Sequence, residues 1–511
     1  MSENVRIAKN SIILYTRLII VLFIGVLSAR FILQALGASD FGLYNVVGGI
    51  VAMMAVLNNV MISTTYRYIA MELGSSNEEG VNKVFNISLV IHITLAAVVL
   101  ILAETVGIYF IKNHINLAPG KLDDAIFVFR LSILSTIFTI LSIPYQGLIF
   151  AKEKFAIFAS VEIFRSVLAF IVVLLVLFFA GNRLRLYASL ISLITILPSL
   201  FYYFYTRKYF TQLIEWKFQR SKTQYKGMVN FSGWLLFGAA ASVGEIQGSV
   251  LLINMFFGTI INASYGIANQ VNTMVKMFAQ SLNQAAIPQI TTNYGGGNTN
   301  RSMQLVIFSS KYAFFLMLLP SLPLLLETDF ILKLWLKNVP QYTAIFMKLM
   351  VINALISTMN SGLYTAVQAS GKIKYFQIIL GTFTILGLPC SYFLFLHGYP
   401  VYTILLVYTF IYVVNFFLYH ILIKRITNFD IEEFYAKAIK KMVSIALIIL
   451  PLFLLAKVMD PGITRLIIVT LLSLLWTLLA IYFVGMDNKE KLITGTYINK
   501  LISRFSSIRT S

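Results

Sequence analysis

Long runs of apolar residues constrain this chain more than any other feature of its sequence. About fourteen runs are each long enough, as helices, to cross roughly 30 Å of hydrocarbon. Backbone polar groups find no water inside a bilayer, so the runs must be helical. Hydrophobic residues make up 59% of the chain and charged residues 12%, well outside the composition of a soluble domain. We therefore expect an all-α polytopic membrane protein.

The runs form two groups of six and a final pair. The first group lies near 11–33, 43–65, 84–110, 125–149, 157–180 and 186–206. The second lies near 229–256, 260–287, 304–326, 341–366, 375–396 and 400–423, and the pair near 442–458 and 463–485. These groups predict three parts, namely an N-lobe over 1–215, a C-lobe over 216–425, and an extra helix pair with a cytoplasmic tail over 426–511.

The second group repeats the first at an offset of about 220 residues. A Lys-x-Lys turn follows the fourth run of each group, at Lys152/Lys154 and at Lys372/Lys374. Three more matches share the offset: Asn10-Ser11 with Asn230-Phe231-Ser232, Phe41-Gly42-Leu43-Tyr44 with Asn262-Ala263-Ser264-Tyr265, and Glu72 to Asn77 with Asn293 to Asn298. Duplicated membrane proteins are usually transporters whose site lies between the repeats. We expect two pseudo-symmetric lobes around a central cavity.

The distribution of basic residues predicts the orientation of the chain. With the amino terminus in the cytoplasm, most Lys and Arg residues fall in cytoplasmic segments, as the positive-inside rule requires. Both termini are then cytoplasmic. Because topology and attraction to anionic lipids explain most of the +20 net charge, we expect no nucleic-acid partner.

Soluble-enzyme features are absent from the sequence. The connectors are too short for a catalytic domain, and Ser370-Gly371-Lys372 lacks the other residues of a phosphate-binding loop. The four histidines are scattered, and the single cysteine, Cys390, lies in an apolar run. We therefore expect no enzyme activity, no metal site and no cofactor.

Several charged residues fall inside the predicted spans, where a cation costs on the order of 3 kcal/mol. The carboxylates among them, Glu162 and Glu245, are candidates for ion coupling, because either can bind a proton or sodium. Glu162 and Arg165 are also spaced to pair on one helical face. The cations outnumber these carboxylates and are candidates for substrate binding: Arg17, Arg30, Arg130, Arg165, Lys276 and Lys311. Two polar candidates, Asn59 and Gln280, occupy matching positions in the second span of each repeat.

Lys276 belongs to a polar stripe that recurs every three or four residues from Asn269 to Gln284. Such a stripe must face a cavity or another helix rather than lipid. Glu245 lies in Gly244-Glu245-Ile246-Gln247-Gly248, where the glycines permit close approach or local unwinding. Cations and amides lining one cavity would suit an anion that carries hydroxyl groups, such as a phosphorylated glycan.

The chain resembles the polysaccharide-biosynthesis flippases of the multidrug/oligosaccharidyl-lipid/polysaccharide exporter superfamily. The resemblance rests on the two six-span repeats, the extra pair, the Lys-rich turn and the segment from Leu36 to Tyr44, LGASDFGLY. It implies a flippase that carries an undecaprenyl-pyrophosphate-linked oligosaccharide from the inner to the outer leaflet of the bacterial cytoplasmic membrane, for O-antigen or capsule synthesis. Related lipid flippases carry arginines in the first span, and Arg17 and Arg30 lie in that span here. Membrane lipids and glycan polymerase machinery are the other implied partners.

Two alternatives remain open. A cation-coupled multidrug exporter of the same superfamily would carry an acidic residue in its first span, and residues 11–33 contain none. A membrane-embedded glycan polymerase or ligase would need a larger external loop. For the flippase we expect alternating access, driven by a coupling ion such as a proton or sodium, or by the membrane potential.

Overall fold

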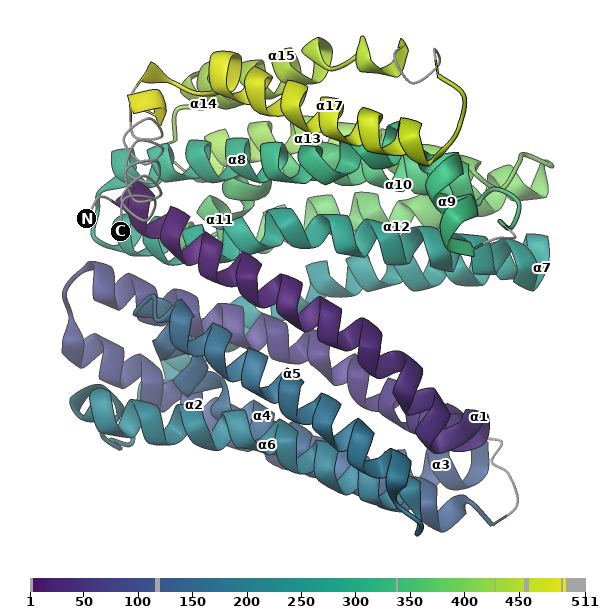
Figure 1. Cartoon of the computed structure of the whole chain (residues 1–511). Coiled ribbons are helices and arrows are strands. Elements are labelled where there is room, and N and C mark those ends of the chain that lie inside the picture. The colour runs from purple at the N-terminus through teal and green to yellow at the C-terminus, as the bar shows by residue number, and fades with distance from the viewer. Residues whose placement is uncertain are drawn as a thin grey trace, which may run out of the picture. The chain divides into compact units, whose positions relative to one another are not determined.

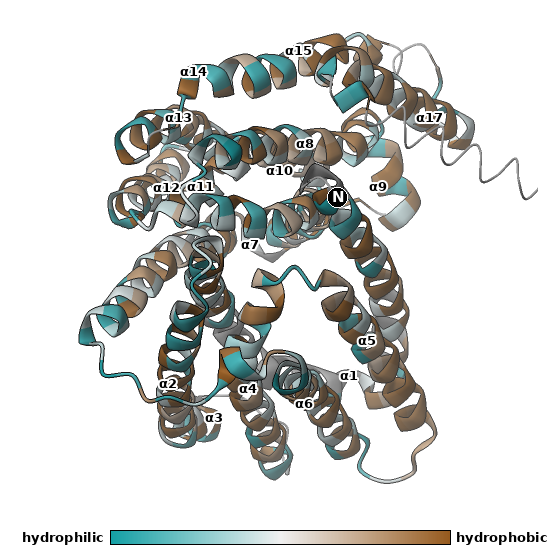
Figure 2. Ribbon diagram, turned by 90° about the vertical axis from the view of Figure 1, so that its left-hand side faces the viewer, coloured by the Kyte–Doolittle hydropathy of each residue, from teal (hydrophilic) through white to brown (hydrophobic). Residues whose placement is uncertain are grey.

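The computed structural model describes residues 3–114, 120–336, 339–427, 429–454, 459–488 and 490–492. Within these residues every regular element is a helix, which confirms the expected fold class (Figure 1). Nine described helices are long and apolar enough to cross a membrane, or ten if the bent pair α10–α11 is one span. Brown, apolar residues predominate along outer helices such as α5 and α17 in Figure 2.

The first repeat contains the helices α1 to α6. Their bounds are α1 Glu3–Gly74, α2 Glu78–Leu102, α3 Ile108–His114, α4 Leu122–Ala151, α5 Phe155–Phe178 and α6 Arg183–Tyr209. A short π-helix, Ala103–Gly107, joins α2 to α3, and a 3-10 turn, Thr211–Ile214, follows α6. The first two predicted spans together form the long α1.

The second repeat contains α7 to α13, and the extra pair follows. The bounds are α7 Lys222–Gly295, α8 Thr299–Leu326, α9 Thr328–Leu336, α10 Thr343–Thr358, α11 Ser361–Ser370, α12 Lys374–Leu396 and α13 Thr403–Ile426. Beyond these lie α14 Ile431–Phe434, α15 Lys440–Ile448 and α17 Ile463–Ala480, with π-helical turns at Tyr435–Ile439 and Ile481–Gly485.

The backbone breaks at the same places in both repeats. Gly37 (φ 74°) interrupts α1 and Gly258 (φ 80°) interrupts α7, one repeat offset apart. Both glycines adopt positive φ, which side chains with a Cβ disfavour. Asn77 and Asn298 then cap α2 and α8, because their side-chain oxygens accept hydrogen bonds from the amides of Gly80 (2.9 Å) and Arg301 (3.2 Å). The local geometry therefore supports the internal repeat.

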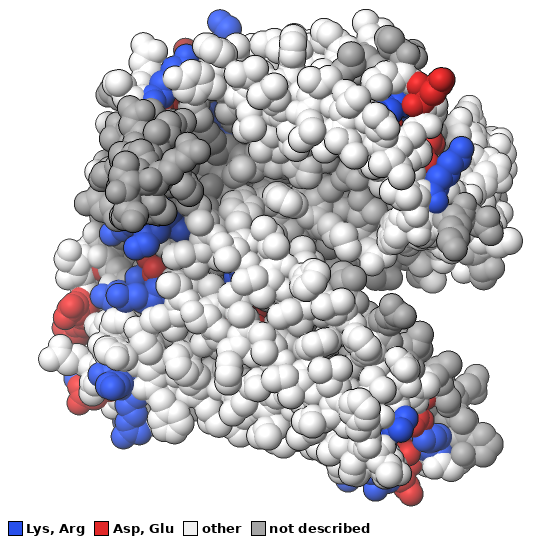
Figure 3. Space-filling model, in the orientation of Figure 1, with Lys and Arg blue, Asp and Glu red and all other residues white. Residues whose placement is uncertain are grey.

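The chain divides into two compact units that do not follow the repeat boundary. Unit 1 contains 1–242, 284–305 and 365–382, and unit 2 contains 243–283, 306–364 and 383–511. Unit 1 thus takes in three segments of the second repeat, at 222–242, 284–305 and 365–382. Charged side chains gather at the ends of the helices on the face shown in Figure 3, and the surface between them is nearly free of charge.

Within unit 1, the carboxyl-terminal ends of α1 and α7 bring the two repeats into close backbone contact. A Cβ on Gly74 would overlap the carbonyl oxygen of Thr292, and a Cβ on Gly295 would lie 2.7 Å from the Met71 backbone. The two contacts are related by the repeat offset, and we call them the glycine crossing. Only glycine permits helices to approach this closely.

Candidate functional site

The first charged site lies in unit 1, between α1 and α5. Arg165 donates to Glu162 across 3.0 Å, so the ion pair that the spacing predicts is present. Arg17 interacts electrostatically with both residues and with Tyr202. Its guanidinium carbon lies 5.1 Å from the ring centroid of Phe158, and its buried Nε has no hydrogen-bond partner among the described residues. We call Arg17, Glu162 and Arg165 the arginine cluster.

The arginine cluster contains two cations and one carboxylate, so it has an excess positive charge. Arg17 is itself partly buried, and a buried donor without a partner is costly. Attraction to the Phe158 ring offsets only part of that cost. The cluster can therefore accept an anionic group.

The second charged site lies in unit 2, between α7 and α13. The hydroxyl of Tyr412 donates to Glu245 Oε1 at 2.8 Å. Lys276 interacts electrostatically with the same carboxylate. Because Gly258 interrupts α7, Glu245 on its first arm can meet Lys276 on its second. We call Glu245, Lys276 and Tyr412 the carboxylate cluster.

Two further tyrosines surround the carboxylate cluster. Tyr265 and Tyr408 are buried and interact electrostatically with Glu245. The helix stays intact around Glu245, so the predicted local unwinding does not occur. The predicted close approach does occur, since a Cβ on Gly248 would lie 2.5 Å from a methyl carbon of Leu388 in α12. One carboxylate opposite one ammonium group makes this site charge-balanced and able to exchange a proton or a cation.

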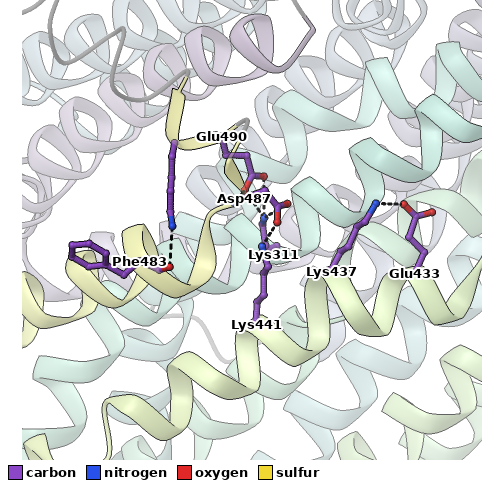
Figure 4. Close-up of polar contacts among 8 residues, drawn as sticks. Lys311, Glu433, Lys437, Lys441, Phe483, Asp487 and Glu490 are labelled. Carbon is purple, nitrogen blue, oxygen red and sulfur yellow. Dashed lines mark hydrogen bonds and ion pairs between the residues drawn. The ribbon is translucent and has the colours of Figure 1, made fainter.

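Lys311 forms part of an internal ion cluster and does not belong to the arginine cluster or the carboxylate cluster. Its side chain is 1% exposed, and its Nζ bonds both carboxylate oxygens of Glu490, at 2.9 and 2.7 Å (Figure 4). Asp487 lies 3.7 Å from the same nitrogen and also pairs with Lys441. Just after the carboxyl end of α8, Glu327 accepts a hydrogen bond of 2.7 Å from Arg465. These pairs fasten the extra helices to α8.

The remaining predicted site residues whose side chains the structure describes do not join either cluster. Arg130 pairs with Glu104 through two bonds, of 3.1 and 2.8 Å, and both side chains are exposed. Asn59 and Gln280 are exposed on α1 and α7. Arg30 lies in α1, but its side chain is outside the described part of the chain.

Two functional candidates were not expected from the sequence. Arg67 is 7% exposed and donates to the backbone carbonyls of Gln368 and Ala369, at 2.5 and 3.0 Å. Glu153, in the first Lys-x-Lys turn, adopts φ 54° and accepts a hydrogen bond from Gln289 at 3.0 Å. Both residues tie the first repeat to the second within unit 1. Nothing in the sequence indicates that Glu153, a non-glycine residue in a repeated turn, adopts a positive φ.

Comparison with known proteins gives one family model and many solved structures. The family model described as MatE matches residues 247–393. No curated relative matches at a significant level. A crystal structure of a point mutant of a MATE protein superposes with TM-score 0.74 at 13% identity, covering 84% of this chain and 98% of that one.

Two other solved structures are informative by their descriptions. An outward-facing multidrug resistance MATE family transporter of the MOP superfamily gives TM-score 0.71 at 13% identity, covering 84% of this chain and 97% of that one. A MOP superfamily transporter from Pyrococcus furiosus gives 0.69 at 12% identity, over 83% and 97%. That protein is described as having a binding pocket of reverse polarity, which suggests a different function for it. At such identities the likeness shows that the chain has the fold of MATE transporters.

Proposed function

We propose that this chain is an exporter of the MOP superfamily that moves amphiphilic substrates across the bacterial cytoplasmic membrane by alternating access. The fold, the MatE match and the internal repeat support this assignment. The glycine crossing supports it as well, because it gives two repeats a shared end about which they can rock. Both termini are cytoplasmic in this proposal.

The comparisons favour a cation-coupled multidrug exporter over a lipid-linked oligosaccharide flippase. One of the matched structures is described as a multidrug resistance transporter. The observation that carries this proposal is the hydrogen bond from Tyr412 to Glu245, beside Lys276. A carboxylate held within the bilayer can bind the coupling proton or sodium, and Lys276 can compete with that ion for it.

The flippase remains the second candidate, on account of the arginine cluster. Two arginines share one carboxylate there, and a lipophilic cation would be repelled. A pyrophosphate-linked lipid glycan would instead form charge-assisted hydrogen bonds with Arg17 and Arg165. Membrane lipids and glycan polymerase machinery would then be its partners.

Transport into proteoliposomes separates the two substrates. Purified protein is supplied with a proton or sodium gradient and with either ethidium or a pyrophosphate-linked lipid glycan. Gradient-driven ethidium movement supports the multidrug exporter, and glycan movement without ethidium movement supports the flippase. Movement of neither substrate would contradict the export proposal.

A disulfide across the repeats tests alternating access. Thr64 and Ser232 come from different repeats, and their hydroxyls are 2.9 Å apart, so cysteines at both positions can be oxidised to a disulfide. In a Cys390→Ser background, oxidation should stop transport and reduction should restore it. Cysteines at Thr65 and Ser88, whose hydroxyls are 2.7 Å apart within the first repeat, provide the control. Equal inhibition by both disulfides would contradict a rocking motion between the repeats.

A further inference from the structure

The backbone of α8 lacks two of the hydrogen bonds that hold a helix together. Pro320 and Pro323 lie inside it, and neither has an amide hydrogen to donate to the residue four positions earlier. Sharp bends in helices are found mostly at such prolines. α8 nevertheless runs as one helix from Thr299 to Leu326 and forms a single candidate span. Contacts with other helices can supply the support that its backbone lacks.

The matching helix of the first repeat differs from α8 in its sequence and in its surroundings. Residues 78–114, which contain α2 and α3, include no proline. The extra helix pair has no counterpart in the first repeat either. The two prolines of α8 and the extra pair that contacts α8 therefore occur together, as expected if the pair compensates for the prolines.

A first ion pair joins α17 to the chain just after the prolines. Glu327 follows Pro323 by four residues, and its amide donates to the Pro323 carbonyl at 2.9 Å. The Glu327 side chain is fully buried and accepts the hydrogen bond from Arg465, near the start of α17. Arg465 also donates to the carbonyl of Met459 at 2.9 Å. A buried pair of this kind resists separation, because either partner alone would be an uncompensated buried charge. We call it the Glu327 clamp.

A second ion pair joins α8 to the extra pair before the prolines. Lys311 precedes Pro320 by nine residues, and its ammonium group is held by Glu490 (Figure 4). Glu490 closely follows the π-helical turn that ends at Gly485, and π-helical turns are frequent at functional sites. A Cβ on Gly485 would lie 2.8 Å from the Phe315 ring, so the extra pair also touches α8 between Lys311 and Pro320. We call the Lys311–Glu490 pair the Lys311 clamp.

α17 and its π-helical turn connect the two clamps. Together they run without a break from Ile463 to Gly485. Buried residues recur along α17 every three or four positions, at Val469, Ser473, Thr477 and Ala480. One face of α17 therefore packs against protein along its length, and its small side chains permit close approach. A continuous helix that is fixed on both sides of the prolines opposes a bend between them.

We propose that the extra helix pair is a splint, which restrains α8 from bending at Pro320 and Pro323 through the Lys311 clamp and the Glu327 clamp. Release of either clamp frees α8 to bend at the prolines. The splint gives a role to the helix pair that the internal repeat does not explain. It goes beyond the export function, because it does not depend on which substrate is carried.

The distance between two spin labels on the chain reports bending of α8. The full chain carries Cys390→Ser, Gln304→Cys and Asp329→Cys in nanodiscs, and residues 304 and 329 are both exposed, one before and one after the prolines. An unbent helix places them roughly 37 Å apart. We expect one narrow distance in this protein, and a shorter second distance where α8 bends.

Each clamp is released by neutralising both of its partners, in Lys311→Met/Glu490→Gln and in Glu327→Gln/Arg465→Gln. These variants leave no uncompensated charge at the clamp, so they should fold. Each should raise the bent population about tenfold, as the loss of one charge-assisted hydrogen bond requires. An unchanged distance distribution in either variant would overturn the splint, which needs both clamps.

Glu433→Gln is the matched control. It removes an ion pair at the same end of the extra pair, between Glu433 and Lys437 at 2.6 Å, which lies within one helical turn and does not involve α8 (Figure 4). The distances should stay as in the unmodified labelled protein. A rise as large as that in the clamp variants would show that any loss of charge disturbs α8, and would contradict the splint.

Removal of the prolines separates a splint from a merely stabilising contact. Pro320→Ala/Pro323→Ala restores the two missing backbone hydrogen bonds. In that background, release of either clamp should change the bent population by less than about twofold, because the clamp and the prolines act on one bend. A tenfold rise with and without the prolines would place the bend elsewhere and contradict the splint. No substrate or gradient is used, so the result is independent of the export proposal.

Discussion

The arginine cluster and the carboxylate cluster are both embedded in predicted spans, yet they differ in charge balance. Two cations share one carboxylate in the arginine cluster, and Arg17 keeps a buried nitrogen without a hydrogen bond among the described residues. In the carboxylate cluster, Glu245 has a tyrosine donor and a nearby ammonium group. An unbalanced site attracts an external counter-charge, and a balanced site can exchange its own. We therefore propose ion coupling at the carboxylate cluster, and at the arginine cluster the binding of an anionic substrate that the flippase candidate requires.

The largest expected effect is on the carboxylate cluster. Glu245→Gln should reduce gradient-driven transport to background, because the amide cannot release or bind the coupling ion. Substrate binding measured without a gradient should persist. Glu104→Gln is the matched control, since Glu104 lies in a candidate span and pairs with Arg130 away from both clusters. Full gradient-driven transport by Glu245→Gln would contradict a role for the carboxylate cluster in ion coupling.

A smaller effect is expected at the arginine cluster. Arg17→Gln should weaken binding of an anionic amphiphile by about tenfold or more, the loss of one charge-assisted hydrogen bond. Arg17→Lys should retain part of that affinity, because it keeps the charge but loses the planar donor group. The measurement is a titration in nanodiscs. An unchanged affinity in Arg17→Gln would show that the excess charge does not recruit substrate.

Tyr412→Phe should have a moderate effect on the carboxylate cluster. It removes the hydroxyl that donates to Glu245 Oε1, a hydrogen bond of about 1 kcal/mol. We expect gradient-driven transport to fall about fivefold, with substrate binding unchanged. Initial rates in proteoliposomes measure this. A loss as complete as that of Glu245→Gln would indicate that Tyr412 takes part in ion exchange itself.

Arg130→Gln should have the smallest effect. Arg130 is 60% exposed and its bonds go to Glu104 rather than to either cluster. We expect transport and binding within about twofold of the wild type, as for exposed ion pairs in general. A large loss of substrate affinity would instead show that Arg130 belongs to the substrate site.

Features that depend on local sequence could be predicted. The apolar runs give the helices, and the gaps between them at about 34–42 and 257–259 contain the breaks at Gly37 and Gly258. The three-residue spacing of Glu162 and Arg165 gives their ion pair. These two side chains lie within one turn of the same helix, where periodicity fixes their positions.

Pairings across the fold could not be predicted. Lys311 meets Glu490 across 179 residues of sequence, and Tyr412 meets Glu245 across 167. Sequence alone therefore left Lys311 as a site candidate and gave no reason to select Tyr412. Arg67 was missed for the same reason, since its partners are backbone carbonyls of the second repeat. Which cation remains without a partner depends on helix packing, not on depth in a span.

Equilibrium binding of polyprenyl phosphate to three proteins tests the division of roles most directly. Wild type, Arg17→Gln and Glu245→Gln are compared in nanodiscs without a gradient. The account predicts that Arg17→Gln weakens binding about tenfold or more while Glu245→Gln stays within about twofold. Equal losses in both variants would contradict it.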